Sequence, residues 1–343
     1  MLQPLLALVF TAIAVGTAAW FFWPVSGLYW RWGRFRLYSD RTLIEDALKH
    51  LYDCEERRHH GTVHSLSGAI GISGPRLSEV IVRLEQLKLA ESEGGAYRLT
   101  AEGRSYALRV IRVHRLWESY LSDDTGFDAR EWHLQAERKE HTTTPEEAEA
   151  LSARMGHPRF DPHGDPIPTP SGEIVPLPGQ PLSDMAPGQV GRIVHLEDEP
   201  QEIYAQLLAE SLYPGMQVRI FEVSPERIRF EAEGEEHVLA PVVAANLSVL
   251  ALPDEETIEE PHERLSALNP GERATVVGLS SACRGAERRR FLDLGLIPGT
   301  EVEAELRSAG GDPTAYRIRG AVIALRREQA EKVQVARSEQ EAA

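Results

Sequence analysis

The feature that most constrains the fold is a repeat in the second half of the chain. A Leu-Ser-x-x-x-Pro-Gly motif occurs at residues 182–188 and again at 265–271, and a Leu-x-Pro-Gly motif occurs at 212–215 and again at 296–299. The two copies keep the distance between their motifs to within one residue. A repeat of this length predicts one small folded unit per copy. Because Pro-Gly turns separate short strand-like segments in both copies, we expect two small β-barrels.

The N-terminus predicts a membrane anchor. Residues 5–23 form an apolar run of 19 residues, and the first charged residue is Arg31. A helix of this length, at about 1.5 Å per residue, nearly spans a hydrocarbon core of about 30 Å. Basic residues from Arg31 onward precede any acidic one, so the positive-inside rule places the residues after Arg31 in the cytoplasm. We expect a single-pass protein of the inner (cytoplasmic) membrane. The alternative is a cleaved signal peptide, but its basic n-region is missing.

Residues 39–120 have the pattern of a winged helix-turn-helix. Three amphipathic helices are expected, followed by a hairpin around Gly94-Gly95 and a further helix from Thr100. In such a unit the second helix of the motif enters the major groove of DNA, and basic residues nearby contact phosphates. The expected DNA-binding residues are Ser73, Pro75, Arg76, Ser78, Glu79, Arg83 and Arg98. A winged helix used only for protein contacts is the alternative. The net charge of −16 argues against a protein that coats nucleic acid without specificity. It does not exclude DNA binding, because a local basic face is sufficient for that.

Two runs place imidazoles and carboxylates at helical spacing. His114 and Glu118 lie four residues apart, as do His133 and Glu137 and then Glu137 and His141. On helices each set shares one face. Nitrogen and carboxylate oxygen without thiolate suit Mn(II) or Fe(II) better than a structural zinc site. A solvated polar helix face is the alternative interpretation.

Proline and glycine dominate residues 156–181. At that density neither a helix nor a sheet is expected, so this segment is predicted to be a crossing between domains. The two cysteines, Cys54 and Cys283, lie far apart and favour reduced thiols over a disulfide framework.

In this order the motifs resemble the DtxR/MntR family of metal-dependent transcriptional repressors, over about Asp40 to Ala251. The resemblance is carried by the helix-turn-helix around Ser73-Gly74-Pro75, the wing ending in Leu99-Thr100-Ala-Glu-Gly103-Arg104, the runs His114-Arg-Leu-Trp-Glu118 and Glu137-Arg-Lys-Glu140-His141, and the crossing. The second predicted barrel is similar to a FeoA domain through Pro270-Gly271, Phe291-Leu-Asp-Leu-Gly295-Leu-Ile-Pro298-Gly299 and Ile323-Ala-Leu325. The first is similar to the related C-terminal domain of many family members.

The resemblance implies two metal sites. The positions that match the primary site are Asp46, Glu137, Glu140 and His141. Those that match the second site are His114, Glu118 and His133. The second site is sometimes completed from the barrel, where this chain has Pro200 and Ile203 in place of an acid or amide. Lys49 stands where a manganese-type repressor has a second acid, and its ammonium repels a divalent ion, so the choice between Mn(II) and Fe(II) stays open.

The predicted fold class is multidomain α+β. The expected order is a transmembrane anchor with a basic flank (1–36), a winged helix-turn-helix DNA-binding domain (37–108), a helical metal-binding and dimerisation domain (109–155), the proline-rich crossing (156–181), a first small β-barrel (182–252), an acidic linker (253–264), a FeoA-like β-barrel (265–336) and a disordered tail (337–343).

Two functional hypotheses follow. The first is a membrane-anchored repressor of metal-ion homeostasis, in which Mn(II) or Fe(II) orients the paired winged helices of a homodimer on double-stranded operator DNA. The second is a membrane-associated metal-sensing adaptor that contacts a metal transporter through its FeoA-like domain without specific DNA binding. An enzyme is not expected, because the sequence has no nucleophile with a base at informative spacing and no phosphate-cradling glycine loop.

Overall fold

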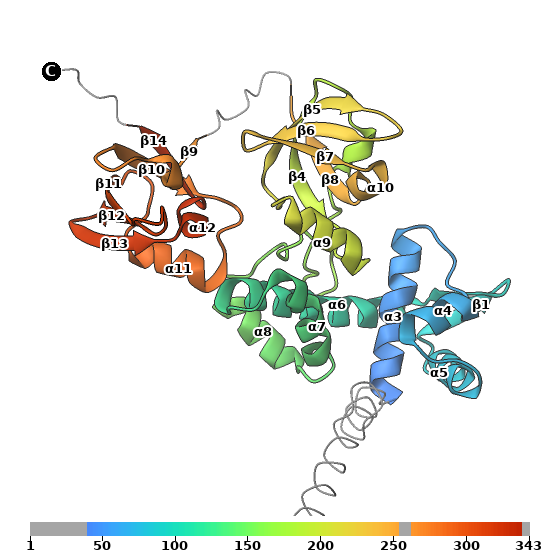
Figure 1. Ribbon diagram of the computed structural model, residues 1–343. Coiled ribbons are helices and arrows are strands. Elements are labelled where there is room, and N and C mark those ends of the chain that lie inside the picture. The colour runs from blue at the N-terminus through green and yellow to red at the C-terminus, as the bar shows by residue number, and fades with distance from the viewer. Residues whose placement is uncertain (1–39, 254–261, 338–343) are drawn as a thin grey trace, which may run out of the picture. The chain divides into compact units, whose positions relative to one another are not determined.

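The computed structural model describes residues 40–253 and 262–337, which form two compact units (Figure 1). The first, here called the winged-helix unit, contains the described residues up to Val113 together with Glu137–Thr144 and Pro170–Gly172. The second, here called the β unit, contains His114–Ala136, Pro145–Thr169 and the described residues from Glu173 onward. The finer domain boundaries expected from the sequence stay a prediction.

The winged-helix unit has the predicted order of elements, which confirms the winged helix-turn-helix. It consists of α3 (Asp40–Glu56), α4 (Val63–Ile70), α5 (Pro75–Gln86), the antiparallel hairpin of β1 (Ala90–Glu93) and β2 (Ala96–Leu99), and the first half of α6 (Ala101–Asp124). The apolar face of α3 forms the centre of its core, where Leu43, Leu48 and Leu51 are at most 1% exposed. The helix α3 packs against α4, α5 and β2, so it contacts both the helix-turn-helix and the wing.

Local chemistry sets the ends of these helices. The Thr62 side chain accepts a hydrogen bond from the Ser65 backbone N–H, and the Ser65 side chain accepts one from Thr62, which is a capping box at the start of α4. Gly71 ends α4 in the left-handed conformation at φ 66°. Pro75 occupies the first turn of α5, where its missing N–H costs nothing. The N-cap of α5 is Gly74.

The β unit begins with a helical part, which includes the second half of α6. It contains most of α7 (Ala129–Glu140), which continues into the winged-helix unit, and α8 (Pro145–Arg154). Leu121 of α6 packs against Trp132 and Ala136 of α7, and all three are buried. In the crossing that follows, Gly164 is required by close packing. A Cβ there would lie 2.0 Å from the Val194 carbonyl oxygen, and its φ is +99°.

The repeat seen in the sequence is a repeat in the structure. The first sheet contains β3 (Gln180–Pro181), β4 (Val190–Leu196), β5 (Gln217–Val223), β6 (Ile228–Ala232), β7 (Glu235–Leu239) and β8 (Leu247–Ala251), in the order β3-β8-β4-β5-β6-β7. The second contains β9 (Glu263–Arg264), β10 (Arg273–Leu279), β11 (Glu301–Arg307), β12 (Thr314–Ile318), β13 (Ala321–Leu325) and β14 (Val333–Arg337), in the order β13-β12-β11-β10-β14-β9. Each strand of the first sheet has an equivalent in the second, six positions later in the strand numbering, so that β3 matches β9 and β8 matches β14. Read from β3 in the first sheet and from β9 in the second, the two strand orders are the same.

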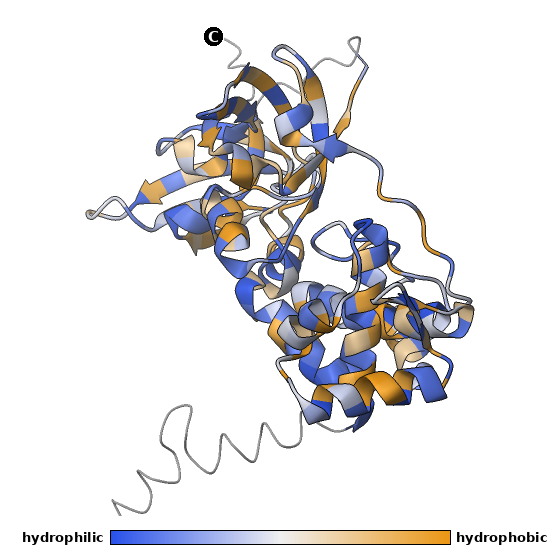
Figure 2. Cartoon of the chain, turned by 90° about the vertical axis from the view of Figure 1, so that its right-hand side faces the viewer, coloured by the Kyte–Doolittle hydropathy of each residue, from blue (hydrophilic) through white to orange (hydrophobic). Residues whose placement is uncertain are grey.

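Irregularities and helices are repeated as well. The register shift between Ile193 and His195 in the first sheet has its equivalent between Val276 and Gly278 in the second. Short helices occur at equivalent places: α9 (Gln201–Ala209) matches α11 (Gly285–Asp293), and α10 (Pro241–Ala244) matches α12 (Arg327–Ala330). Hydrophobic and hydrophilic residues alternate along the strands, as Figure 2 shows, so each sheet has one face toward its own core.

Two expectations are corrected. The closed barrels are wrong: within the described residues, β3 and β7 at the edges of the first sheet pair with one neighbour each, as do β9 and β13 in the second. A closed barrel would require the two edge strands of a sheet to pair with each other, and neither β3 with β7 nor β9 with β13 does so.

The membrane localisation is also wrong. In the part of the chain that the structure describes, no helix has both the length and the apolar character needed to cross a bilayer. The run at residues 5–23, on which that expectation was based, lies outside the described residues.

Candidate metal centres and DNA-binding face

Three of the four predicted primary ligands come together in the winged-helix unit. Asp46 lies on α3, Glu140 is the last residue of α7, and His141 follows it. The His141 Nε2 atom is 3.2 Å from Asp46 Oδ1 and 3.3 Å from Glu140 Oε1, and the three ligand atoms lie within 4.8 Å of one another. Two carboxylates and an imidazole in this arrangement fit a hard to borderline divalent cation.

A carboxylate that the sequence reasoning missed orients this cluster. Glu45 is 1% exposed, and its Oε2 atom is 2.7 Å from His141 Nδ1. Arg41 and Tyr106 both donate hydrogen bonds to Oε1 of the same carboxylate. Because Glu45 occupies Nδ1, the Nε2 atom of His141 is left facing Asp46 and Glu140, as in the carboxylate–histidine–metal arrangement of many metal sites. Its position directly before Asp46 was the available signal.

These contacts shift the titration of the cluster. Burial lowers the pKa of His141, but hydrogen bonds to Asp46 and Glu45 and the charge of Glu140 outweigh it and raise that pKa to about 9. Burial raises the pKa of Glu45, but hydrogen bonds from His141, Arg41 and Tyr106 bring it below its ordinary value. In the absence of metal, the site therefore holds a protonated imidazole at neutral pH.

Lys49 lies in the same cluster, one turn after Asp46 on α3. Its ammonium is 2.8 Å from one Glu140 oxygen and 3.0 Å from the other, and the Glu140 side chain is 0% exposed. Burial lowers the pKa of Lys49, but the ion pair with Glu140 and the nearby charges of Glu137 and Asp46 raise it overall. Lys49 is therefore a resident cation on one of the predicted metal ligands.

Glu137, the fourth predicted primary ligand, is exposed and does not belong to this cluster. It lies one turn before His141 on α7, close enough for its charge to act on Lys49. The helical spacing placed it on the correct face, but the ligand atoms that meet are those of Asp46, Glu140 and His141.

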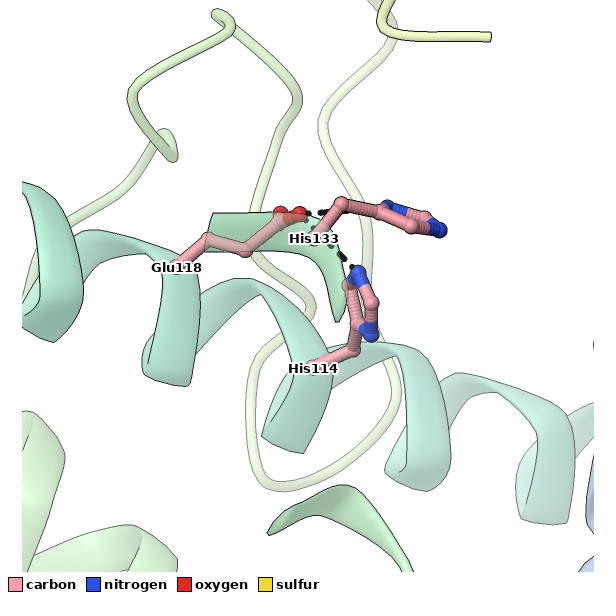
Figure 3. Close-up of side chains that lie close together, drawn as sticks. All are labelled: His114, Glu118 and His133. Carbon is pink, nitrogen blue, oxygen red and sulfur yellow. Dashed lines mark hydrogen bonds and ion pairs between the residues drawn. The ribbon is translucent and has the colours of Figure 1, made fainter. Parts of the chain in front are cut away.

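All three predicted second-site ligands come together in the β unit (Figure 3). His114 Nε2 is 3.0 Å from Glu118 Oε1, one turn along α6, and His133 Nδ1 of α7 is 3.4 Å from the same oxygen. The side chains of His114 and Glu118 are 8% and 2% exposed. Burial raises the pKa of Glu118, but the charges of His114 and His163 and the hydrogen bonds from His114 and His133 hold it well below its ordinary range.

Two further residues missed by the sequence reasoning lie at this second cluster. Asp198, just after β4, has its Oδ2 atom 3.0 Å from His133 Nδ1. His163, in the crossing, has its Nδ1 atom 3.8 Å from both Glu118 Oε2 and Asp198 Oδ2. The expected barrel positions do not take part: Pro200 caps α9, and Ile203 packs against the core of the first sheet. The acidic run Glu197-Asp198-Glu199 directly after a strand was the available signal for Asp198.

The predicted DNA-binding residues all lie on the surface of the winged-helix unit. Ser73, Pro75, Arg76, Ser78, Glu79, Arg83 and Arg98 are all exposed, on or before α5 and on the wing strand β2. Arg76 forms ion pairs with Asp40 and with Glu79. Arg98 pairs with Glu93 at 2.7 Å. Contact with phosphate would require these arginines to exchange their carboxylate partners.

Two known protein families match parts of the chain. Residues 100–169 match the family model described as iron dependent repressor, metal binding and dimerisation domain, and residues 263–337 match the FeoA domain. The match to the FeoA domain covers the second sheet of the repeat.

Individual relatives point the same way. The iron-dependent repressor IdeR of Mycobacterium leprae is 33% identical over 125 residues, which are 36% of this chain and 54% of that protein. The chain thus spans about half the length of that curated relative. A solved structure described as a manganese-dependent transcriptional repressor in complex with manganese aligns with a TM-score of 0.57 and 27% identity, over 61% of this chain and all of the other.

A shorter similarity involves a transport protein. A probable metal transport system membrane protein of Chlamydia trachomatis is 42% identical over 72 residues, which are 21% of this chain and 16% of that protein. So small a share carries neither membrane location nor transport to this chain, and the adaptor hypothesis is unsupported. None of these relatives is named as an enzyme, in agreement with the expectation from the sequence. The chain is therefore similar to an iron-dependent and to a manganese-dependent repressor over part of its length, and its C-terminal residues 263–337 match the FeoA domain in addition.

Proposed function

We propose that the protein is a metal-dependent DNA-binding transcriptional regulator, a repressor of metal-ion homeostasis that acts as a homodimer on double-stranded operator DNA. The observation that carries this proposal is the cluster of Asp46, Glu140 and His141. Asp46 belongs to the first helix of the winged helix, and the other two stand at the end of α7. An ion bound there joins two elements that are 94 residues apart in sequence, from 46 to 140.

The ion proposed is Mn(II) or Fe(II). The donors are carboxylate oxygens and one imidazole, without thiolate, and such sets suit these ions. The names of the relatives, an iron-dependent and a manganese-dependent repressor, support the same two ions. When bound, the ion supplies positive charge that compensates Asp46 and Glu140 and takes the place of the His141 proton.

The residues of the chain determine what this binding does. Glu45 holds the His141 ring so that Nε2 faces the site. Because α3 packs against α5, fixing α3 to the end of α7 fixes the direction of the recognition helix. In a symmetric dimer this sets the separation of two recognition helices, which must match half-sites about 34 Å apart. Metal affinity and DNA affinity are then reciprocally linked.

The contacts with DNA are proposed at the exposed residues of α5 and the wing. The start of α5, from Ser73 to Glu79, would face base edges, and Arg83 and Arg98 would face phosphates. The second cluster of His114, Glu118 and His133 is proposed as a further metal site. The domain boundaries expected from the sequence are part of this proposal for residues 37–336.

A selection experiment tests the proposed function. Full-length protein is incubated with random double-stranded DNA in Mn(II) or in chelator, bound DNA is recovered over several rounds, and the pools are sequenced. We expect a palindromic motif to be enriched in Mn(II) only, and lost in the Glu140→Ala, His141→Ala double variant. Enrichment of the same motif in chelator, or no enrichment in either condition, would overturn the proposal.

A further inference from the structure

His163 is a buried histidine that belongs to neither of the predicted ligand sets. Its side chain is 2% exposed, and within the described residues neither ring nitrogen has a hydrogen-bond partner. A buried polar atom left unsatisfied costs about 1–3 kcal/mol, so such an atom calls for a ligand or a water molecule. The nearest acceptors are Glu118 Oε2 and Asp198 Oδ2, both 3.8 Å from Nδ1. That distance is too long for a hydrogen bond but fits two ligands of one cation.

The position of His163 is fixed by its surroundings. Its backbone N–H donates to Asp161 Oδ1 at 2.9 Å, and its carbonyl oxygen accepts from Leu196 N–H at 2.9 Å. Its ring stands edge-on to Tyr204, with centroids 5.1 Å apart. Gly164 allows this close approach, because no other residue fits against the Val194 carbonyl. A ring whose backbone is fixed and whose face or edge packs against a neighbour is preorganised as a ligand, as metal sites require.

The two carboxylate oxygens of Glu118 lie near different histidines. Oε1 lies near His114 and His133, whereas Oε2 lies near His163. The donors accordingly form two sets, His114–Glu118–His133 and Glu118–His163–Asp198, and within each set the ligand atoms lie within 4.8 Å of one another. Glu118 belongs to both. A carboxylate shared in this way is the usual bridge of a two-metal centre, whose ions stand about 3.5–4 Å apart.

The surroundings are acidic enough for a second cation. Besides Glu118 and Asp198, Glu199 reaches to 3.4 Å from His133 Nε2. Asp161, two residues before His163, is also buried, at 8% exposed. His163, Asp198 and His133 line a pocket of about 270 Å³, which gives room for an ion and its water ligands.

We propose that Glu118, His163 and Asp198 hold a second divalent cation beside the one expected at His114, Glu118 and His133, with Glu118 as the bridge between the two ions. This proposal extends the second site of the proposed function. It shares no ligand with the cluster of Asp46, Glu140 and His141. If the second ion were absent, the proposed DNA-binding role would therefore stay in place. The centre draws its ligands from α6, α7, the crossing and the segment directly after β4. It would link these four parts of the β unit in a metal-dependent way.

Counting bound ions tests the proposal. The Glu140→Ala, His141→Ala double variant of the full chain removes the primary site and serves as the background. Mn(II) bound per chain is measured by equilibrium dialysis with elemental analysis, and its EPR spectrum is recorded. We expect two ions per chain, with an exchange-coupled spectrum. Adding His163→Ala should reduce the count to one and restore the six-line spectrum of an isolated Mn(II) ion.

Matched controls separate a ligand from a structural histidine. His157 is a 64%-exposed histidine of the same crossing, and His157→Ala should leave the count at two. Thermal unfolding in chelator reports whether each variant folds. If His163→Ala does not fold, His163→Gln and Asp198→Asn provide the same comparison with smaller changes of shape. A count of one in the background, or a count that His163→Ala and Asp198→Asn leave unchanged, would overturn the two-ion centre.

Discussion

Lys49 is the residue whose replacement should change metal binding most informatively. In Lys49→Met the aliphatic stem is retained and the ammonium is lost, so Glu140 keeps its packing but loses both of its hydrogen bonds to Lys49. Removing one partner of a buried ion pair costs about 3–5 kcal/mol. Because the Lys49 side chain is 23% exposed, the lower end, about 3 kcal/mol, is the better figure. We therefore expect the metal-free variant to unfold roughly 10 °C or more below the wild type in chelator.

The same variant should bind metal more tightly. In the wild type a divalent ion must displace the ammonium from Glu140 and bind beside a like charge, whereas in Lys49→Met the ion restores the charge balance that the substitution removed. A difference of about 3 kcal/mol corresponds to up to about a hundredfold in affinity. Competition with a chromogenic chelator measures the Mn(II) affinity directly.

The control for this prediction is Lys139→Met. Lys139 is an exposed lysine next to Glu140, so the net charge changes equally while the cluster is left intact. It should alter Mn(II) affinity less than threefold. If Lys49→Met bound Mn(II) with unchanged or weaker affinity, or kept the wild-type unfolding temperature in chelator, Lys49 would not be the resident cation that the geometry indicates.

Four other predictions concern the winged-helix unit. Glu45→Gln removes the charge that holds His141, and should weaken Mn(II) binding about 10–100-fold in the same competition assay while leaving the fold intact. Since the pKa of His141 is raised to about 9, Mn(II) binding displaces its proton, and affinity should rise by about a factor of ten per pH unit below that value. In the metal-free protein the stability contributed by protonated His141 is fully present below its unfolded pKa of about 6.5 and is lost as pH rises through 9, so thermal unfolding in chelator should show a decline across that range. Gly103→Ala would bring a Cβ to 1.8 Å from the Leu89 carbonyl oxygen, and should destabilise the unit by about 3 kcal/mol in chemical denaturation; a loss under 1 kcal/mol would show that α6 can shift away from the wing.

Local patterns in the sequence predicted the local parts of the structure. The His114–Glu118 pair meets because residues four apart share a helix face, and the hairpin forms at Gly94-Gly95 because both glycines adopt positive φ. The duplicated Pro-Gly motifs predicted two equivalent units, and the two sheets have the same strand order.

The remaining parts depend on contacts that periodicity does not encode. Asp198 and His163 reach the second cluster from segments without helical or strand pattern, and their approach depends on the packing of Gly164 against β4. Glu45 was missed because a buried carboxylate on a helix is recognised only once its partners are known. Whether a sheet closes depends on whether its two edge strands pair with each other, and turn motifs do not specify that pairing.

Metal binding at the cluster of Asp46, Glu140 and His141 should be coupled to DNA binding at α5. The most direct test is a linkage measurement on a selected DNA fragment, in which DNA affinity is measured at increasing Mn(II) and Mn(II) affinity is measured with and without the DNA. We expect saturating Mn(II) to strengthen DNA binding, the fragment to strengthen Mn(II) binding by the same factor, and Glu140→Ala to abolish both effects. Equal DNA affinity in chelator and in Mn(II) would contradict it.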